Sequence, residues 1–600
     1  MAEPNEKPSA DYGLLGRLLR EARPYRTLLI VSAALAILSA PLAALRPRLV
    51  QSMVDDYIVK FDLAGLQKTT LIIAGVLVLE AIVRYAFTYL TNWLGQSVVR
   101  DLRDKVFRHI TSLRLTYFDR TPIGTSTTRT INDIQTLNTV FTDGGIAIIA
   151  DILVVFVVLG IMFSISWRLT LICLTTVPLL IIASYIFKEK VKSAFQKVRT
   201  QISRMNAFLQ ERISGMAIVQ AFNAEGQEGR KFRDINRAYT QANLDSIFYY
   251  AVFFPVVEIL SAASLGLMVW WGARGVIGGE VSLGVLVAFP LYLNMLFRPI
   301  RTLADKFNTL QMGLVAAERV FRVLDRDDVI PDRGQVPAAD PLTADGTAGV
   351  QRLRGDIEFD DVTFAYVEAE WVLRGVSFRL PAKQTLAIVG STGSGKSTII
   401  NLLSRFYEVQ RGAIRLDGRP LEDYRLAYLR SRIAIVLQDV FLFGGSVLDN
   451  IRLADASISR ARVEEAARML GAHAFIERLP GGYDHVVHER GATLSMGQRQ
   501  LISFVRALVF DPDVLVLDEA TSSIDPESEA VIQYAIERLL ERRTSIVIAH
   551  RLATIRHADR ILVLDRGEVV EYGSRSELLA LDGGRFRELW DMQYAGEVEG

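Results

Sequence analysis

Six long apolar stretches in the first half of this 600-residue chain constrain its fold more than any other feature. They lie at about 27–49, 69–94, 144–166, 169–187, 247–272 and 284–300. A helix needs roughly 20 apolar residues to cross a bilayer, because its backbone groups find no water there and must bond within the segment. Buried helices of a water-soluble protein would show runs of only about 10–14 residues. The pattern therefore predicts six transmembrane helices embedded in a lipid bilayer.

The overall composition narrows the class of protein further. Half of the residues are hydrophobic, yet 22% are charged and the mean hydropathy is +0.24. A net charge of +1 argues against a nucleic-acid partner, which requires a strongly basic face. The single cysteine, Cys173, excludes an internal disulfide or a cysteine metal cluster. The first residues lack the pattern of a cleaved signal peptide, so we expect the first apolar segment to remain as an anchor.

Positive charges predict the orientation in the membrane. Lys and Arg are concentrated in the two long segments 95–143 and 188–246, whereas two short turns on the other side offer only Arg168 and Arg274. The first outer loop is less clear, because basic and acidic residues are mixed there. Since cytoplasmic loops carry the excess of positive charge, both long segments and both termini are expected in the cytoplasm. The long segments keep a helical apolar rhythm, and 10–24 resembles an amphipathic helix on the inner membrane surface.

A few ionisable and polar residues interrupt the apolar stretches, at a cost of a few kcal/mol each at mid-membrane. Glu80 and Arg84 are spaced i, i+4 and can neutralise each other on one helix face. Asp151 and Glu258 are isolated in their stretches, and Asn294 is a further polar group. One interpretation is that Glu80, Arg84, Asp151, Glu258 and Asn294 line a water-accessible translocation cavity, most strongly for Glu258. The alternative for Glu80 and Arg84 is a structural pair.

The second half of the chain begins after an aperiodic linker at 325–352 and contains a phosphate-binding motif. An apolar strand at 384–389 is followed by a glycine-rich loop and then a helical segment, which matches G-x-x-x-x-G-K-[ST] in its required setting. In such a loop the backbone N–H groups surround phosphate oxygens at a helix N-terminus. The expected ATP-binding residues are Gly390, Ser391, Thr392, Gly393, Ser394, Gly395, Lys396, Ser397 and Thr398. Lys396 would reach the β- and γ-phosphates, and Ser397 would ligate Mg²⁺.

A second carboxylate-bearing strand supports the same chemistry. Four apolar residues at 514–517 end in Asp518 and Glu519. The strand would deliver Asp518 to the Mg²⁺ site, and Glu519 would polarise the attacking water as the general base.

The segment Leu494-Ser495-Met496-Gly497-Gln498 closely resembles the signature of the ATP-binding cassette (ABC) family, which precedes that aspartate at a similar distance. Further residues match the family's motifs in the expected order. The resemblance implies that Tyr366 stacks on adenine, that Gln438 touches Mg²⁺, that Asp525 belongs to the D-loop, and that His550 contacts the γ-phosphate. Glu519, His550, Lys396 and Gln438 are then the catalytic set.

The resemblance covers almost the whole chain and implies its architecture. We expect an N-terminal tail with an interfacial helix at 1–26, an all-α six-helix transmembrane domain at 27–324, a linker at 325–352 and a cassette at 353–600. The cassette would be an α/β P-loop (RecA-like) nucleotide-binding domain with an antiparallel β subdomain and a helical subdomain. In that family, short helices near 118–124 and 214–224 dock into the cassettes.

The layout of one membrane domain and one cassette implies half of a dimeric exporter of the bacterial cytoplasmic membrane. Importers usually keep the two parts on separate chains, and peptidase-containing peptide exporters need an N-terminal catalytic cysteine. The expected cargo is an amphipathic small molecule, a drug or a lipid. An ATP-gated channel or regulatory protein on the same scaffold is the rival from another class, which an intact Glu519 disfavours.

Met496 departs from the family pattern, which has glycine at that position, and His488 replaces a frequent glycine. The resemblance implies that two cassettes meet head to tail, so that Ser495, Met496, Gly497, Gln498 and Asp525 face the partner's ATP. The residues used for this chain's own ATP are intact, so the asymmetry favours a heterodimer with one degenerate site. The alternative is a homodimeric exporter of lipids or peptides that tolerates methionine at this position.

Overall fold

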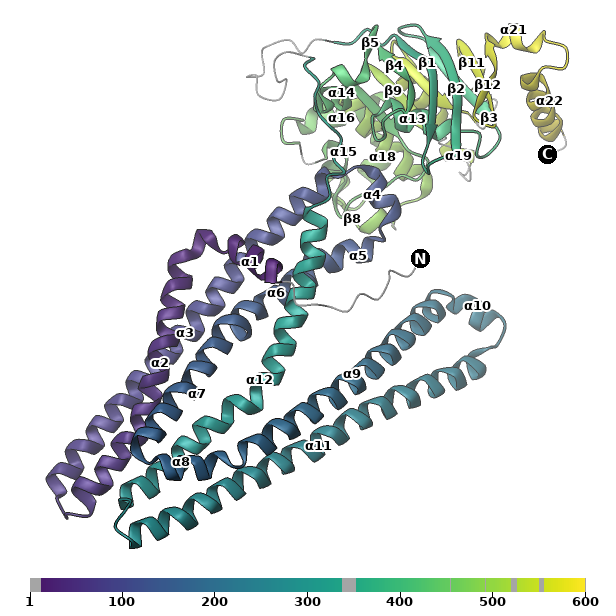
Figure 1. Cartoon of the computed structure of the whole chain (residues 1–600). Coiled ribbons are helices and arrows are strands. Elements are labelled where there is room, and N and C mark those ends of the chain that lie inside the picture. Colours follow the sequence, from purple (N-terminus) through teal and green to yellow (C-terminus); the bar gives the residue numbers. More distant parts are fainter. Residues whose placement is uncertain are drawn as a thin grey trace. The chain divides into compact units, whose positions relative to one another are not determined.

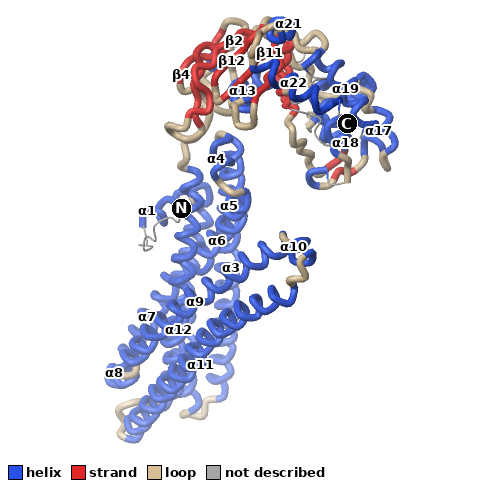
Figure 2. Tube along the Cα trace, turned by 90° about the vertical axis from the view of Figure 1, so that its right-hand side faces the viewer, coloured by secondary structure: helices blue, strands red, loops and turns tan. Residues whose placement is uncertain are grey.

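The computed structural model describes residues 12–336, 352–453, 455–491, 493–518, 526–549 and 555–598. These residues form two compact units (Figure 1). The first contains the described residues up to Thr111 together with Thr121–Asp327, and the second contains Ser112–Arg120 and the described residues from Asp328 onward. Figure 2 shows that the first unit is helical, and the strands all lie in the second.

The first unit consists of long helices joined by short turns. Its helices are α1 (Tyr12–Glu21), η1 (Arg23–Tyr25), α2 (Arg26–Ser52), η2 (Met53–Ile58), α3 (Leu63–Ser112), α5 (Ile123–Thr128), η3 (Arg129–Asp133), α6 (Ile134–Thr139), η4 (Val140–Gly144), α7 (Gly145–Ile165), α8 (Trp167–Leu174), α9 (Val177–Ser214), α10 (Met216–Ala221), α11 (Glu225–Ile277) and α12 (Leu283–Leu324). Among the described residues, five helical stretches are long and apolar enough to cross a membrane, and Leu283–Pro299 within α12 is a shorter apolar segment. The five stretches coincide with the first five predicted spans, and the sixth predicted span, 284–300, falls on the shorter segment.

The long segments between the spans are helical, as their apolar rhythm predicts. Helix α3 has 50 residues and α11 has 53. At 1.5 Å per residue each is about 75–80 Å long, more than twice the ~30 Å thickness of the hydrocarbon core. Each helix therefore extends well beyond the bilayer that it can span.

The predicted fourth span is interrupted. Helix α7 ends at Ile165, and α8 begins at Trp167 after Ser166, whose hydroxyl accepts from the Leu169 N–H at 3.4 Å. Helix α8 then ends at Leu174 and α9 begins at Val177, with Pro178 in its first turn. Proline has no N–H for the preceding turn and favours the start of a helix. The span 169–187 is therefore a short helix followed by a long one.

A buried cluster holds six helices of the first unit together. Phe289 and Tyr292 of α12 are fully buried in it, together with Val158 of α7 and Met268 of α11. The Tyr292 hydroxyl donates to the Ala44 carbonyl oxygen of α2 at 3.2 Å, which satisfies its polar end inside the bundle.

Helices α9 and α11 form a long hairpin whose tip is α10 (Figure 1). Phe187 of α9 stacks on Phe253 of α11, with ring centroids 3.9 Å apart. None of the α10 residues is buried, and Ile213, Ile218 and Phe222 around the tip are 63–78% exposed. The tip is an exposed apolar surface in this chain.

The second unit contains the sheets predicted for a P-loop domain. Six strands follow the order β12-β11-β3-β10-β9-β6, in which only the β11–β12 pair is antiparallel. Four strands form an antiparallel sheet in the order β2-β1-β4-β5. The strands are β1 (Ile357–Ala365), β2 (Trp371–Leu380), β3 (Thr385–Gly390), β4 (Arg411–Leu416), β5 (Arg419–Pro420), β6 (Ile433–Val436), β7 (Gly445–Ser446), β8 (Val486–Val487), β9 (Val514–Asp518), β10 (Thr544–Ile548), β11 (Arg560–Asp565) and β12 (Glu568–Gly573).

Most of the helices of the second unit pack in two large apolar cores. One core joins the two large sheets to α13 (Lys396–Leu403) and α14 (Leu426–Arg432). The other joins α15 (Val447–Arg452), α16 (Arg460–Met469), α17 (His473–Arg478), α18 (Met496–Val509) and α19 (Pro526–Leu540). The short α21 (Arg575–Leu579) and α22 (Arg585–Val598) follow the last strand. The P-loop sheet, the antiparallel β subdomain and the helical subdomain are thus all present, which confirms the predicted fold class.

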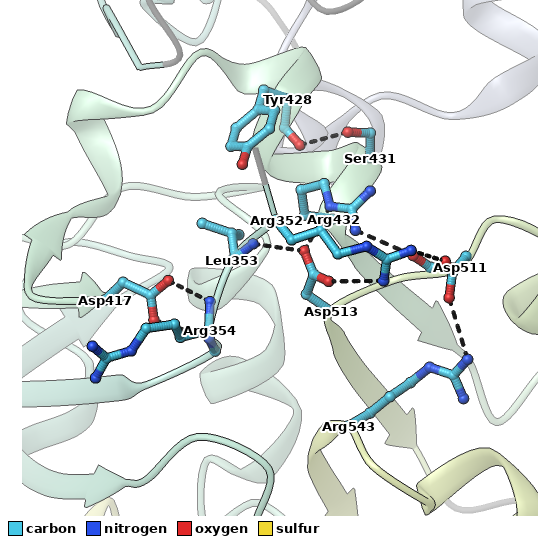
Figure 3. A network of polar contacts seen from close by, with 11 residues as sticks. Arg352, Leu353, Arg354, Asp417, Tyr428, Ser431, Arg432, Asp511, Asp513 and Arg543 are labelled. Atoms are coloured by element: carbon cyan, nitrogen blue, oxygen red, sulfur yellow. Dashed lines mark hydrogen bonds and ion pairs between the residues drawn. The ribbon is translucent and has the colours of Figure 1, made fainter. Parts of the chain in front are cut away.

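A network of ion pairs attaches the residues that follow the linker to this unit (Figure 3). Asp513 is almost fully buried and accepts from the Arg432 Nε at 2.7 Å and from the Leu353 N–H at 2.9 Å. Arg352 also pairs with Asp513 at 3.6 Å and with Asp511. These contacts lie where β6 and β9 begin. The P-loop follows the end of β3, which runs parallel to them, so the network holds the chain at the opposite ends of the strands from the P-loop.

Candidate nucleotide-binding site

The glycine-rich loop connects the end of β3 to the start of α13. Gly393 and Gly395 have φ angles of 83° and 103°, in the left-handed region that side chains disfavour. A Cβ on Gly395 would lie 2.6 Å from the Leu373 side chain. The loop therefore brings its backbone N–H groups together at the N-terminus of α13, a geometry that favours an anion.

Side chains of the loop fit a phosphate ligand. The Lys396 ammonium group donates to the carbonyl oxygens of Gly390 and Ser391, at 2.8 and 2.9 Å. Ser394 is 2% exposed, and its hydroxyl has no hydrogen-bond partner among the described residues. A buried hydroxyl without a partner is costly, and a phosphate oxygen would accept its hydrogen bond.

The candidate Mg²⁺ ligands follow the same edge of the parallel sheet. Asp518 is the last residue of β9, and Gln438 follows the end of β6 by two residues. Strand β10 pairs with both β9 and β3, so that Ile548 is opposite Asp518 on one side and Ile388 on the other. Hydroxyl, amide and carboxylate oxygens from Ser397, Gln438 and Asp518 suit Mg²⁺, which needs few protein ligands when phosphates supply the others. The described residues contain no cluster of three or more His, Cys, Asp or Glu that could hold a metal ion.

Tyr366 lies just after β1 and reaches the start of α13. Its hydroxyl donates to Thr398 Oγ1 at 3.2 Å and accepts from Asn401 Nδ2 at 3.1 Å. Its ring makes edge-to-face contacts with Phe364 and Tyr407, at centroid distances of 4.9 and 5.0 Å. An aromatic ring is therefore held in a fixed position beside the P-loop helix.

The signature-like segment begins α18. Ser495 is the N-cap: its hydroxyl accepts from the Gln498 N–H at 3.2 Å, and the Ser495 N–H donates to Gln498 Oε1 at 3.0 Å. This reciprocal pair is a capping box. Met496 is 36% exposed, and its sulfur lies 3.6 Å from Arg499 Nη2. The thioether therefore occupies space at the exposed N-terminus of this helix, where glycine would leave the backbone open.

The remaining predicted site residues, Glu519, Asp525 and His550, lie outside the described residues. The structure describes the strands that lead to two of them, β9 up to Asp518 and β10 up to Ile548. Their roles remain predictions from the sequence.

Comparison with known proteins decides the family. Residues 29–300 match the ABC transporter transmembrane region, and residues 373–522 match the ABC transporter domain. The chain is 38% identical to YknV, an uncharacterized ABC transporter ATP-binding protein of Bacillus subtilis, over 99% of this chain and 96% of that protein. The chain belongs to the ABC transporter family.

Other relatives of this ABC transporter carry more specific names. It is 35% identical to an ATP-dependent lipid A-core flippase of Desulfotalea psychrophila, over 97% of this chain and 99% of that protein. It is 37% identical to YheH, a probable multidrug resistance ABC transporter ATP-binding/permease protein of Bacillus subtilis, over 89% of this chain and 77% of that protein. The chain is thus a multi-pass bacterial membrane protein in which an ATPase is coupled to transport.

The predicted cavity residues of this ABC transporter lie on four helices. Glu80 and Arg84 are on α3, Asp151 is on α7, Glu258 is on α11 and Asn294 is on α12. Glu80 lies 3.9 Å from Arg46 of α2, which differs from the pairing with Arg84 that the i, i+4 spacing permits. The side-chain amide of Asn294 donates to the Pro290 carbonyl oxygen of its own helix at 3.1 Å.

Sequence reasoning missed the partners of several charged and aromatic residues in this ABC transporter. Asp151 pairs with Lys306 of α12 at 2.5 Å. In the second unit, Asp119 and Arg120 contact Tyr407 and the Tyr366 carbonyl oxygen. The only signal in the sequence was the position of 118–124 as a docking segment, which does not reveal these contacts.

Proposed function

We propose that this chain is one half of a dimeric exporter that uses ATP to move amphipathic small molecules, drugs or lipids, across the bacterial cytoplasmic membrane by alternating access. The observation that carries the proposal is a P-loop whose buried Ser394 hydroxyl has no hydrogen-bond partner among the described residues, on a chain whose described helices include five that are long and apolar enough to cross a membrane and one shorter apolar segment. The names of the relatives, a lipid A-core flippase and multidrug proteins, support this class of cargo. The excess of positive charge in the two long segments supports a cytoplasmic cassette.

The proposed roles of the site residues combine the positions of the described ones with what the resemblance to the family implies. Lys396 and the loop backbone hold the β- and γ-phosphates, and Tyr366 receives the adenine. Ser397, Gln438 and Asp518 would hold Mg²⁺, which neutralises charge on the phosphate oxygens. Glu519 follows Asp518 at the end of β9 and is proposed to accept a proton from the attacking water, while His550 contacts the γ-phosphate.

The proposed partner is a second half-transporter, and a heterodimer is favoured. In the head-to-tail arrangement that the family implies, the N-terminus of α18 faces the partner's ATP. The exposed Met496 side chain stands at that terminus, while Lys396 and Asp518 are intact for this chain's own ATP. The exposed apolar tip around α10 supports a partner as well, since Ile218 and Phe222 are exposed in the part of the chain that the structure describes.

Substituting Glu519 tests the proposed chemistry. Glu519→Gln removes the general base but keeps the side-chain size, so we expect ATP turnover of the assembled transporter to fall by about 100-fold or more, with ATP binding retained. The measurement is ATPase activity and equilibrium ATP binding of the purified transporter in nanodiscs. Glu568→Gln, in β12, is the matched control and is expected to leave both unchanged. ATP turnover near wild type in Glu519→Gln would remove this residue from the role of base.

The partner is tested by purifying this chain alone. The heterodimer proposal predicts weak ATPase activity, because the chain would have to supply a Met496-containing signature to its own copy. Met496→Gly is expected to raise that activity several-fold, since it reopens the backbone at the start of α18. Robust, cooperative activity of the wild-type chain alone, unchanged by Met496→Gly, would instead establish the homodimer.

A further inference from the structure

The short helix α4 (Leu115–Arg120) comes from the helical half of the sequence but belongs to the same compact unit as the cassette. It is anchored there by Tyr117, which is 1% exposed, and by backbone bonding of the preceding Arg114 N–H to the Asp328 carbonyl oxygen at 2.9 Å. In the chain, α4 is directly followed and preceded by helices of the first unit.

The last two residues of α4 contact the two tyrosines beside the P-loop helix. Arg120 Nη2 donates to the Tyr366 carbonyl oxygen at 2.9 Å. The carboxylate of Asp119 accepts a hydrogen bond from the Tyr407 hydroxyl. Tyr407 is 9% exposed and lies edge-to-face with Tyr366. Burial and the Asp119 carboxylate both raise the pKa of Tyr407, so this hydroxyl keeps its proton and its role as donor.

Tyr366 is therefore held from three directions. Its hydroxyl bonds to Thr398 and Asn401 of α13, its ring contacts Tyr407, and its carbonyl oxygen accepts from Arg120. Any ligand that stacks on this ring restricts the same side chain that α4 helps to hold. Because coupling between two binding events is reciprocal, docking of α4 and stacking on Tyr366 must strengthen each other if both favour one position of the ring.

We propose that Asp119 and Arg120 are positioning residues through which α4 responds to the base of the bound nucleotide. Asp119 holds Tyr407, Arg120 holds the Tyr366 backbone, and together they fix the ring on which adenine stacks. The base, rather than the phosphates, is then what stabilises α4 on the cassette. This inference rests on the proposed function, since it requires that the site binds ATP.

The test separates the base from the phosphates. Equilibrium binding of ATP and of inorganic tripolyphosphate, each with Mg²⁺, is measured on the full-length transporter in nanodiscs. In Asp119→Ala/Arg120→Ala, the affinity for ATP is expected to fall about 5-fold or more, while the affinity for tripolyphosphate stays at its wild-type value. Conservative Asp119→Asn/Arg120→Lys keeps an acceptor and a donor and is expected to restore most of the ATP affinity.

Two further variants keep the test decisive. Glu408→Ala removes the 3.0 Å ion pair with Arg114, another contact near α4, leaves the hydrogen bonds of both tyrosines in place, and is expected to change neither affinity. Tyr407→Phe keeps the buried ring but loses the hydroxyl. It is expected to lower the affinity for ATP by a smaller factor than Asp119→Ala/Arg120→Ala does, and to leave the affinity for tripolyphosphate unchanged. The inference is overturned if Asp119→Ala/Arg120→Ala lowers the affinities for ATP and tripolyphosphate equally. It is also overturned if the ATP affinity is unchanged in both this variant and Tyr407→Phe. Failure of the wild-type transporter to bind ATP would instead contradict the proposed function.

Discussion

Replacing Asp513 with alanine would measure how strongly the network in Figure 3 stabilises the cassette. The Asp513 and Arg432 side chains are only 7% and 11% exposed, and their ion pair is 2.7 Å long. Removing one partner of a buried pair costs about 3–5 kcal/mol, because the remaining charge is left uncompensated away from water. Asp513→Ala also removes the acceptor of the Leu353 N–H. For a domain of this size each kcal/mol lowers the Tm by about 2–4 °C, so we expect a loss on the order of 10 °C.

The assay is differential scanning calorimetry of the full-length protein in detergent. The cassette transition is identified as the one that Mg²⁺ and ATP shift upward, because a ligand stabilises the unit that binds it. Asp360→Ala is the matched control. Asp360 is 55% exposed and pairs with the half-buried Arg415, so its loss is expected to cost about 0–1 kcal/mol and no more than ~4 °C.

A double variant separates the uncompensated charge from the lost contacts. Arg432→Met in the Asp513→Ala background removes the remaining charge and fills similar space with an apolar chain. Replacing a buried pair by apolar residues is often nearly neutral, so we expect the Tm to recover by several degrees. Equal, small shifts for Asp513→Ala and Asp360→Ala, or no recovery in the double variant, would refute the argument that a buried charge carries the effect.

Two other properties follow from the cassette. Lys396→Ala removes the ammonium group of the P-loop, so ATP turnover of the assembled transporter is expected to fall by about 100-fold or more in an ATPase assay, with the nucleotide-free Tm little changed. Burial raises the pKa of Asp511, but Arg352 and Arg543 more than offset this and hold its pKa below the usual value. Ionised Asp511 therefore contributes fully to the stability of the folded cassette above about pH 4, and this contribution is lost as the pH falls through the lowered pKa of the folded state. In Asp511→Asn, the Tm should depend less on pH below about pH 4.

Local and periodic signals were sufficient for most of the fold. Five of the apolar stretches fall on described helical stretches that are long and apolar enough to cross a membrane, so a run of apolar residues was sufficient to predict them. The P-loop also depends on neighbouring residues: glycines at 393 and 395 adopt the left-handed angles that the motif requires. The capping box of Ser495 and Gln498 is equally local, since [ST]-x-x-[EQ] before a helix predicts it.

Side-chain contacts between residues far apart in the sequence could not be predicted from such local patterns. The i, i+4 spacing permits Glu80 to pair with Arg84, but the structure places Arg46 of α2 3.9 Å from Glu80. The direction of a side chain depends on its neighbouring helix as well as on its own. Likewise, Asp119 and Tyr407 are 288 residues apart in sequence, and only the folded second unit brings them together. Positions of charged residues in a sequence therefore indicate that partners are needed without identifying them.

Asp151 illustrates how the structure changes an interpretation. It is isolated in its apolar stretch, which allowed a role in a translocation cavity. In the structure its carboxylate lies 2.5 Å from the Lys306 ammonium group, and both side chains are about one-quarter exposed. A charge inside a membrane protein that already has its counter-charge needs no cargo to account for it. We therefore expect Asp151 and Lys306 to form a structural pair between α7 and α12.

A charge exchange tests this expectation. Asp151→Asn or Lys306→Met alone should lower the stability of the helical unit by about 1.5–3 kcal/mol, because each leaves the other charge without its hydrogen-bonded partner. The exchange Asp151→Lys/Lys306→Asp restores opposite charges at the same two positions. If the pair is structural, the exchange should recover both the Tm and the export of cargo from vesicles. Recovery of the Tm with export still lost would show that the carboxylate at position 151 contacts the cargo itself, because its pairing alone would then be insufficient for transport.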